Sequence, residues 1–348
     1  MKSVVIENPI VNSAFSEPKR HFRFDDEGIT NEVIEKRRIS HYFSPIAKPK
    51  KKDNQTQLEL EFWTNDRIEE NAFINQIRQC VSLWRNADYR GTVNITPITR
   101  RLLEYWKNPE RERRLFFCQL EALETIIYLT EVAPKSGKAW FINKLNEFKD
   151  VANPLLFRMA TKMATGSGKT VVMSMLIAWH TLNKAANPQR REFSDAFLIV
   201  APGITIRDRL RVLQPNDPEN YYQKLDLVPP DLRGDLAKAK IVITNYHSFK
   251  LREKGNAASL TKSILIKDKE ESPFTETPSQ MVKRVCRELG TKKNIIVIND
   301  EAHHCYRRKE NGDEPTYKGD DRKEAEKNQK EAQLWISGLE AIQEKLGV

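Results

Sequence analysis

The stretch Met163-Ala164-Thr165-Gly166-Ser167-Gly168-Lys169-Thr170 decides the fold that we expect for this chain. It follows a mostly apolar run, 155–160, and opens a second apolar run, 171–179. Strand, glycine loop and helix in this order form a phosphate-binding unit, because the loop N–H groups surround a phosphate at the helix N-terminus. The strict phosphate-loop pattern asks for glycine where this chain has Met163, so the prediction depends on the flanking strand and helix. The alternative is a flexible turn between two core elements.

Three kinds of residue in this loop suit a nucleotide. Gly166 and Gly168 let the backbone approach closely and adopt conformations that a side chain would forbid. Lys169 supplies a positive charge to the β- and γ-phosphates, and the Thr170 hydroxyl can bind Mg²⁺. The loop therefore predicts a nucleotide site.

Three further short apolar runs follow the loop, at 196–201, 241–244 and 295–298, and helical or polar stretches separate them. Apolar runs without alternation are typical of strands that are buried on both faces. Strands that alternate with helices predict an α/β fold with a parallel sheet and right-handed crossovers. We expect these runs and residues 155–160 to form one such sheet, with the ligand beyond the carboxyl ends of its strands.

A second group of chemical residues, Asp300-Glu301-Ala302-His303, ends the fourth run. An acidic residue at a strand end can hold Mg²⁺, and the next carboxylate can activate the water that attacks a γ-phosphate. The alternative is a solvated carboxylate pair without a role. His303-His304-Cys305 invites a metal interpretation, but three adjacent residues do not converge on one tetrahedral ion, so we expect no metal there.

The composition favours a folded, basic protein. Of 348 residues, 39% are hydrophobic and 30% charged, which supports a packed core under a solvated surface and excludes a disordered chain. The length suits about two domains. The net charge of +10 favours polyanionic partners, with nucleic acid first, although a generic basic protein has the same surplus.

The cysteines and the apolar runs indicate the cellular compartment that we expect for the protein. The four cysteines are far apart and form no C-x-x-C pair, so neither a disulfide framework nor a zinc ribbon is suggested. Residues 1–13 do not resemble a signal peptide, and no apolar run approaches the roughly 20 residues that cross a bilayer. We therefore expect a location in the reducing cytoplasm and no membrane partner.

Residues 1–110 are expected to form a mixed accessory region without chemistry of its own. Alternation at 58–62 predicts a strand, and apolar spacing predicts helices at 73–84 and from Pro97 onward. The basic run 48–52 is interpreted as a solvated loop, with phosphate contact as the alternative.

A long helix is predicted over 111–132, with Gln119 near its start. A Gln placed upstream of a phosphate loop can read an adenine edge with its two-sided amide, although a surface Gln is the default interpretation. At the other end of the chain, Trp335, Leu339, Ile342 and Leu346 form the apolar stripe of a final helix.

With these residues in place, the chain resembles superfamily 2 helicases of the DEAD/DEAH kind. Within that group it is similar to the restriction subunit of type III restriction enzymes. The resemblance covers about 111–348 and is carried by Gln119, 163–170, 201–207, 243–247 and 300–304. It implies that 111–348 is the first RecA-like ATP-binding domain, in the P-loop class.

The resemblance also implies a role for each matching residue. Gln119 would contact the adenine of the nucleotide. The residues that would hold its phosphates are Thr165, Gly166, Ser167, Gly168, Lys169 and Thr170. Thr170 and Asp300 would hold Mg²⁺, with Lys169, Asp300 and Glu301 as the catalytic group and Glu301 activating water. Pro202, Arg207 and Thr244 would lie near a nucleic-acid backbone, and His303 would couple nucleotide state to nucleic acid.

The implied ligands are ATP and Mg²⁺, and the implied partners are DNA and a modification (methyltransferase) subunit. The family continues with a Ser-Ala-Thr segment, a second RecA-like domain and a nuclease domain, whereas this sequence stops at Val348. We interpret it as a fragment, a split gene product or one half of a two-chain motor, with slow turnover on its own. The alternatives are a truncated, non-catalytic nucleotide- and DNA-binding module and an RNA helicase on the same scaffold.

Overall fold

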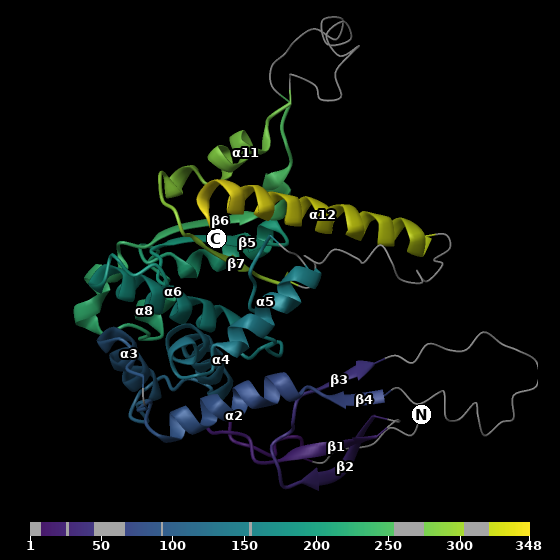
Figure 1. Ribbon diagram of the computed structural model, residues 1–348, viewed down its shortest axis with the longest axis vertical. Helices are drawn as coiled ribbons and strands as arrows, with labels where there is room; N and C mark the ends of the chain where they lie inside the picture. The colour runs from purple at the N-terminus through teal and green to yellow at the C-terminus, as the bar shows by residue number, and fades with distance from the viewer. Residues whose placement is uncertain are drawn as a thin grey trace, which may run out of the picture.

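A three-stranded parallel sheet lies at the centre of the computed structural model, which describes residues 8–25, 28–44, 67–91, 93–152, 155–253, 275–302 and 320–348 (Figure 1). Its strands are β5 (Ala196–Ala201), β6 (Lys240–Asn245) and β7 (Ile296–Asn299), in the order β6-β5-β7. The three strands predicted after the glycine loop are therefore confirmed, and so is the α/β class with a parallel sheet.

The register brings the carboxyl ends of the three strands to one edge. Ala201 of β5 pairs with Asn245 of β6, and Val200 pairs with Asn299 of β7. The residues that follow each strand consequently emerge side by side at this edge. In open parallel sheets this edge is where ligands bind.

Helices cover both faces of the sheet (Figure 1). Phe197 and Ile199 of β5 belong to a core shared with α6 (Lys169–Ala186). Leu198 and Val200 point the other way, into a core shared with α11 (Pro278–Val285) and α12 (Asp320–Leu346). All six residues of β5 are buried, which is why its sequence shows no alternation.

The helices before the loop pack on the α6 side of the sheet. They are α2 (Ala72–Asn86), α3 (Pro97–Lys107), α4 (Phe117–Ile127) and α5 (Trp140–Ala152). Thr96 caps α3 by accepting a hydrogen bond from the Thr99 N–H, and Pro97 occupies the first turn. The predicted helices at 73–84 and from Pro97 are confirmed, and one hydrophobic core runs from α2 to the sheet.

Short elements complete the described chain. Two antiparallel pairs precede α2: β1 (His21–Asp25) with β2 (Gly28–Ile34), and β3 (His41–Ser44) with β4 (Arg67–Glu70). After β5 come α7 (Ile204–Arg209), η3 (Leu210–Leu213), α8 (Tyr221–Lys224), η4 (Pro230–Leu232) and α9 (Arg233–Leu236). The remaining turns are η1 (Tyr128–Val132), η2 (Ala133–Lys135), η5 (Tyr246–Phe249) and η6 (Arg287–Leu289). The predicted strand at 58–62 and the basic run 48–52 lie outside the described residues.

The strand predicted at 155–160 is wrong. Residues 155–160 carry no strand assignment, and among the described strands β7 pairs only with β5. Leu156 is buried in the α12-side core, but Leu155 and Phe157 are 59% and 40% exposed. An apolar run forms a strand only where an adjacent strand has backbone groups available for hydrogen bonding. The composition of the run does not show whether such a strand lies beside it.

The helix predicted over 111–132 begins later and ends differently. Long-range hydrogen bonds hold its first residues: the Arg111 guanidinium donates to the carbonyl oxygens of Leu225 and Asp226, at 3.0 and 2.6 Å. The α-helix therefore starts at Phe117, and from Tyr128 it widens into the π-helical turn η1.

None of the helices among the described residues combines the length and the apolar character that crossing a bilayer requires.

Candidate nucleotide-binding site

The glycine loop has the backbone that its sequence predicts. Gly166 and Gly168 have φ angles of +79° and +84°, in the left-handed region that favours glycine. Gly168 is the N-cap of α6, so the N–H groups of Lys169 and Thr170 have no partner within the helix, whereas the Val171 N–H donates to the Gly168 carbonyl oxygen at 2.9 Å. Ser167 closes the loop, because its N–H and hydroxyl both donate to the Ala164 carbonyl oxygen. This geometry presents backbone donors to an anion.

The loop and the acidic pair meet although they are distant in the sequence. The Lys169 Nζ lies 3.9 Å from the Glu301 Oε1, and the two side chains are 33% and 36% exposed. Lys169 begins α6, and Glu301 is the second residue after β7, so the parallel topology brings them together at the carboxyl edge. An exposed pair at this separation contributes little stability, so both groups remain accessible to a ligand.

Asp300 is held at the same edge. Its N–H donates to the Val200 carbonyl oxygen at 3.0 Å, and its Oδ1 accepts the Glu301 N–H at 3.2 Å. Burial raises the pKa of Asp300, the Glu301 carboxylate raises it further, and Lys169 and the Glu301 N–H oppose the shift. Glu301 has a φ of +53°, which is rare for this residue type. A desolvated carboxylate beside a second one is stabilised by a bound cation.

Gln119 braces the loop against α4. Its Oε1 accepts the Phe116 N–H at 2.9 Å, and its Nε2 donates to the Ser167 carbonyl oxygen at 3.0 Å. The residue is 5% exposed. A Cβ at Gly168 would lie 2.2 Å from the Gln119 Nε2, so glycine is required for this close approach. The amide thus has a structural partner at each end, and its contact with adenine stays a prediction.

The donor set at the edge fits Mg²⁺. Thr170 is half-buried in the first turn of α6, Asp300 is half-buried beyond β7, and Thr165 is exposed in the loop. Mg²⁺ takes hard oxygen ligands and is usually held by one or two carboxylates together with substrate phosphates and water. The described residues contain no group of three or more metal-ligating side chains, which is compatible with such a shared site.

The predicted nucleic-acid residues lie at the same edge of the sheet. Pro202 and Arg207 are half-buried at the turn into α7 and within it, and the Arg207 guanidinium pairs with Asp208 at 2.9 Å. Thr244 is buried near the end of β6, and its hydroxyl donates to the Asn245 carbonyl oxygen at 3.4 Å. His247, three residues further along in η5, is exposed; it lies in the matching segment 243–247, but the sequence analysis gave it no role. His303 and the segment that follows it lie outside the described residues.

An ion-pair network under α4 was not predicted. The Glu124 side chain is 1% exposed and accepts from Arg85 at 2.6 Å. Arg37 pairs with Glu121 at 2.5 Å. The two guanidinium groups lie over the Phe117 ring, Arg85 at 4.7 Å and Arg37 at 5.5 Å from its centroid. Because Phe117 opens the helix that carries Gln119, this network joins α2 and Arg37 to the N-terminal end of α4. No spacing rule links such distant charges.

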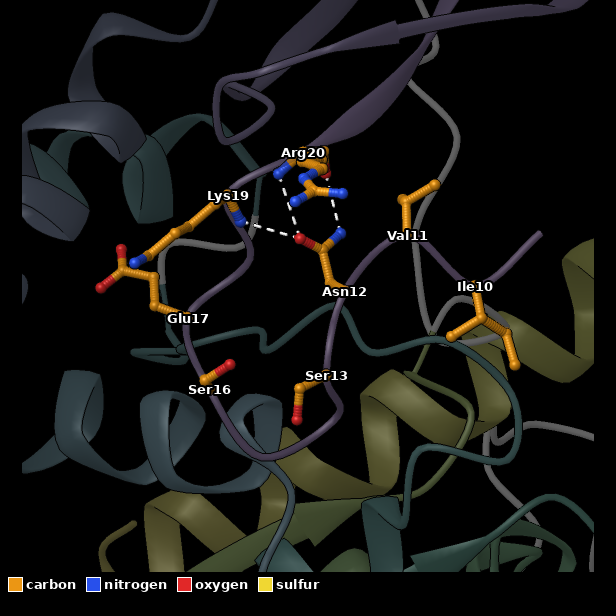
Figure 2. A pocket seen from close by; sticks show the side chains of 8 residues that line it. All are labelled: Ile10, Val11, Asn12, Ser13, Ser16, Glu17, Lys19 and Arg20. Atoms are coloured by element: carbon orange, nitrogen blue, oxygen red, sulfur yellow. Dashed lines mark hydrogen bonds between the residues drawn. The ribbon is translucent and has the colours of Figure 1, made fainter. Parts of the chain in front are cut away.

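Two hollows lie away from the glycine loop. One, of about 460 Å³, lies within residues 10–20. There the Asn12 side chain accepts hydrogen bonds from the N–H groups of Lys19 and Arg20 and donates one to the Arg20 carbonyl oxygen (Figure 2). The other, of about 380 Å³, lies between η5, α11 and α12. Neither is lined by residues of the loop or of the acidic pair.

The parallel sheet, the glycine loop and the acidic pair form an α/β domain with the elements expected of a nucleotide site. A comparison with known families matches residues 113–338 to the family described as type III restriction enzyme, res subunit. The chain belongs to this family and carries its helicase-type ATPase domain. No curated protein and no solved structure shows a significant match to the chain.

Proposed function

We propose that this chain binds ATP with Mg²⁺ at the carboxyl edge of the sheet and uses it to drive movement on DNA, as the first RecA-like domain of a type III restriction subunit. The observation that carries the proposal is the 3.9 Å contact between the Lys169 Nζ and the Glu301 Oε1. It joins a glycine loop at a helix N-terminus to a carboxylate pair at a strand end. This combination suits a triphosphate and its metal.

The triphosphate would lie over the first turn of α6. The backbone N–H groups of the loop that contains Thr165, Gly166 and Ser167 would donate to its oxygens, and Lys169 would leave Glu301 to pair with the β- and γ-phosphates. With Lys169 on the phosphates, the Glu301 carboxylate would orient a water molecule and accept its proton. The two side chains already lie 3.9 Å apart at the place where the proposed triphosphate would bind.

Thr170 and Asp300 would hold Mg²⁺. When bound, the ion neutralises charge that develops on the phosphates. Asp300 suits this role because its carboxylate is already desolvated, which raises its pKa and makes a cation a favourable partner. Gln119 would hold the loop in position from α4, with adenine as its proposed ligand.

DNA would contact the edge formed by Pro202, Arg207 and Thr244, and His303 would couple the two ligands. The net charge of +10 supports a polyanionic partner. The family concerns restriction enzymes, so we propose duplex DNA as the substrate and a modification subunit as a protein partner. The division into an accessory region, 1–110, and a nucleotide domain, 111–348, stays part of the proposal.

Calorimetric titration of the chain with ATP and Mg²⁺ tests the nucleotide site. We expect saturable binding by the wild-type chain and at least tenfold weaker binding by Lys169→Ala. The matched control is Lys184→Ala, near the other end of α6, where the amine donates to the Arg190 carbonyl oxygen at 3.0 Å. Nucleotide affinity that Lys169→Ala leaves unchanged would refute the proposed site.

The DNA assignment is tested by the salt dependence of binding. Arg207→Ala should reduce the slope of log affinity against log salt by about 1. Arg101→Ala is the control, because Arg101 is also an arginine in an ion pair, with Asp231 at 2.7 Å. Competition between duplex DNA and RNA at one salt concentration separates the DNA motor from an RNA helicase, and RNA that wins this competition would contradict our assignment.

A further inference from the structure

Trp335 touches the ends of two strands that are not neighbours. It lies in α12 and is 1% exposed. Its indole Nε1–H donates to the Asn299 Oδ1 at 3.1 Å. Asn299 is the last residue of β7 and directly precedes Asp300, which belongs to the proposed metal site. The indole nitrogen is therefore hydrogen-bonded to the residue that precedes the proposed metal site.

The face of the same indole is tied to β6. The Trp335 and Tyr246 rings stack with their centroids 5.0 Å apart and their planes 5° from parallel. Tyr246 directly follows Asn245, the last residue of β6, and opens the turn η5 beside Thr244. Because β5 lies between β6 and β7, no strand pairing joins these two ends, whereas the indole joins them directly.

The rest of α12 holds the indole in place. A Cβ at Gly338 would lie 2.3 Å from the Phe249 ring, so the helix approaches η5 as closely as glycine permits. Burial and a hydrogen bond with Glu331 raise the pKa of Tyr246 to about 12, so its hydroxyl remains protonated and stays paired with α12. Figure 1 shows α12 lying along the sheet on the side opposite α6. A movement at either strand end must therefore displace the indole or break one of its contacts.

We propose that Trp335 is a positioning residue that transmits the state of the nucleotide site, at the end of β7, to the proposed nucleic-acid contact at the end of β6, through Asn299 and Tyr246. The inference rests on the proposed function. Binding of a metal at Asp300 shifts the end of β7, the indole follows through its hydrogen bond, and the stacked Tyr246 carries the shift to β6. Such coupling is reciprocal, so DNA changes the affinity for ATP by the same factor as ATP changes the affinity for DNA.

The test uses the full chain and measures the ATP·Mg²⁺ dissociation constant with and without a saturating duplex DNA, at one salt concentration. The ratio of the two constants is the coupling factor, which is typically 5- to 150-fold in coupled sites, or about 1–3 kcal/mol. Trp335→Phe keeps an aromatic ring against Tyr246 but removes the donor to Asn299. We expect the coupling factor to fall at least threefold while each ligand alone binds within twofold of wild type.

Trp106→Phe is the matched control. Trp106 is also 1% exposed, and its Nε1–H donates to the Leu227 carbonyl oxygen at 2.8 Å in the other core. The Trp106→Phe variant loses an equivalent hydrogen bond and should keep the wild-type coupling factor. If a general loss of stability lowered the coupling factor, this variant would lower it too. If Trp335→Phe does not fold, Asn299→Ala removes the acceptor instead and should lower the factor in the same way.

The outcomes separate this inference from the proposed function. A wild-type chain that binds both ligands, with a coupling factor that Trp335→Phe retains in full, overturns the inference and leaves the function intact. A wild-type coupling factor of one has the same meaning. A wild-type chain that binds no ATP·Mg²⁺ overturns the proposed function, and the inference with it.

Discussion

Replacing Gly168 with alanine probes the contact between the glycine loop and α4. Gly168 has a φ of +84°, and an added Cβ would lie 2.2 Å from the Gln119 Nε2. To make room, the Gln119 amide must leave the Ser167 carbonyl oxygen, to which it donates at 3.0 Å. The substitution therefore strains the backbone and breaks a buried hydrogen bond.

The two effects differ in size. A side chain in the left-handed region costs about 1–2 kcal/mol, and alanine returns about 0.4–1 kcal/mol by restricting the unfolded chain. Leaving a buried amide unpaired costs about 1–3 kcal/mol. We expect Gly168→Ala to lower the free energy of unfolding by about 2–3 kcal/mol.

Gly166→Ala is the matched control. Gly166 has a φ of +79°, and a Cβ there would meet nothing within 4 Å. It should show the backbone strain alone, about 1 kcal/mol after the gain from the unfolded chain. Urea unfolding followed by circular dichroism measures both variants.

A double-mutant cycle with Gln119→Ala isolates the contact. In the Gln119→Ala background the obstacle is removed, so Gly168→Ala should cost no more than Gly166→Ala does. If Gly168→Ala costs the same in both backgrounds, or no more than Gly166→Ala in the wild type, then Gln119 does not brace the loop.

Three further predictions concern other parts of the molecule. Burial lowers the pKa of His180 to about 3, so the stability that the neutral imidazole allows is fully present above the unfolded pKa near 6.5 and is lost as pH falls toward 3. Below pH 6 the free energy of unfolding of His180→Phe should therefore rise relative to that of the wild type by about 1.4 kcal/mol for each pH unit, as measured by urea unfolding. Parallel pH profiles of the two proteins would contradict this. Arg85→Ala leaves the buried Glu124 carboxylate without its guanidinium and should cost about 3–5 kcal/mol in thermal or urea unfolding, whereas the exposed Arg101→Ala should cost below about 1 kcal/mol. The exposed Cys118 thiol lies beside the glycine loop, so ATP·Mg²⁺ should slow its alkylation by a maleimide, as measured by mass spectrometry of the labelled peptide; an unchanged rate would place the nucleotide elsewhere.

The sheet could be predicted where burial alone determines the sequence. All residues of β5 are buried, so its apolar run needs no information about neighbours. The run 155–160 is also apolar apart from Arg158, but it lies beside no strand edge among the described residues and stays irregular. Composition reports burial, whereas strand formation also depends on a hydrogen-bonding partner.

The meeting of Lys169 and Glu301 could be predicted for a similar reason. The glycine loop lies at the start of a helix and the acidic pair lies at the end of a strand. In a parallel α/β sheet, these two positions lie at the same edge of the sheet. The contacts of Gln119 with the loop, of Arg85 with Glu124 and of Trp335 with Asn299 could not be predicted. Each contact joins segments that are distant in the sequence and depends on the geometry of individual side chains. Such contacts produce no periodic pattern in the sequence.

The central claim is that Lys169 and Asp300 serve one triphosphate with its metal. The most direct measurement is the ATP·Mg²⁺ affinity of Lys169→Ala, Asp300→Asn and the double variant, by calorimetry. A shared site predicts that each single change weakens binding and that the double variant loses less than the sum of the two, by about 1 kcal/mol or more. Losses that add to within about 0.5 kcal/mol, or an Asp300→Asn variant with wild-type affinity, would contradict the account.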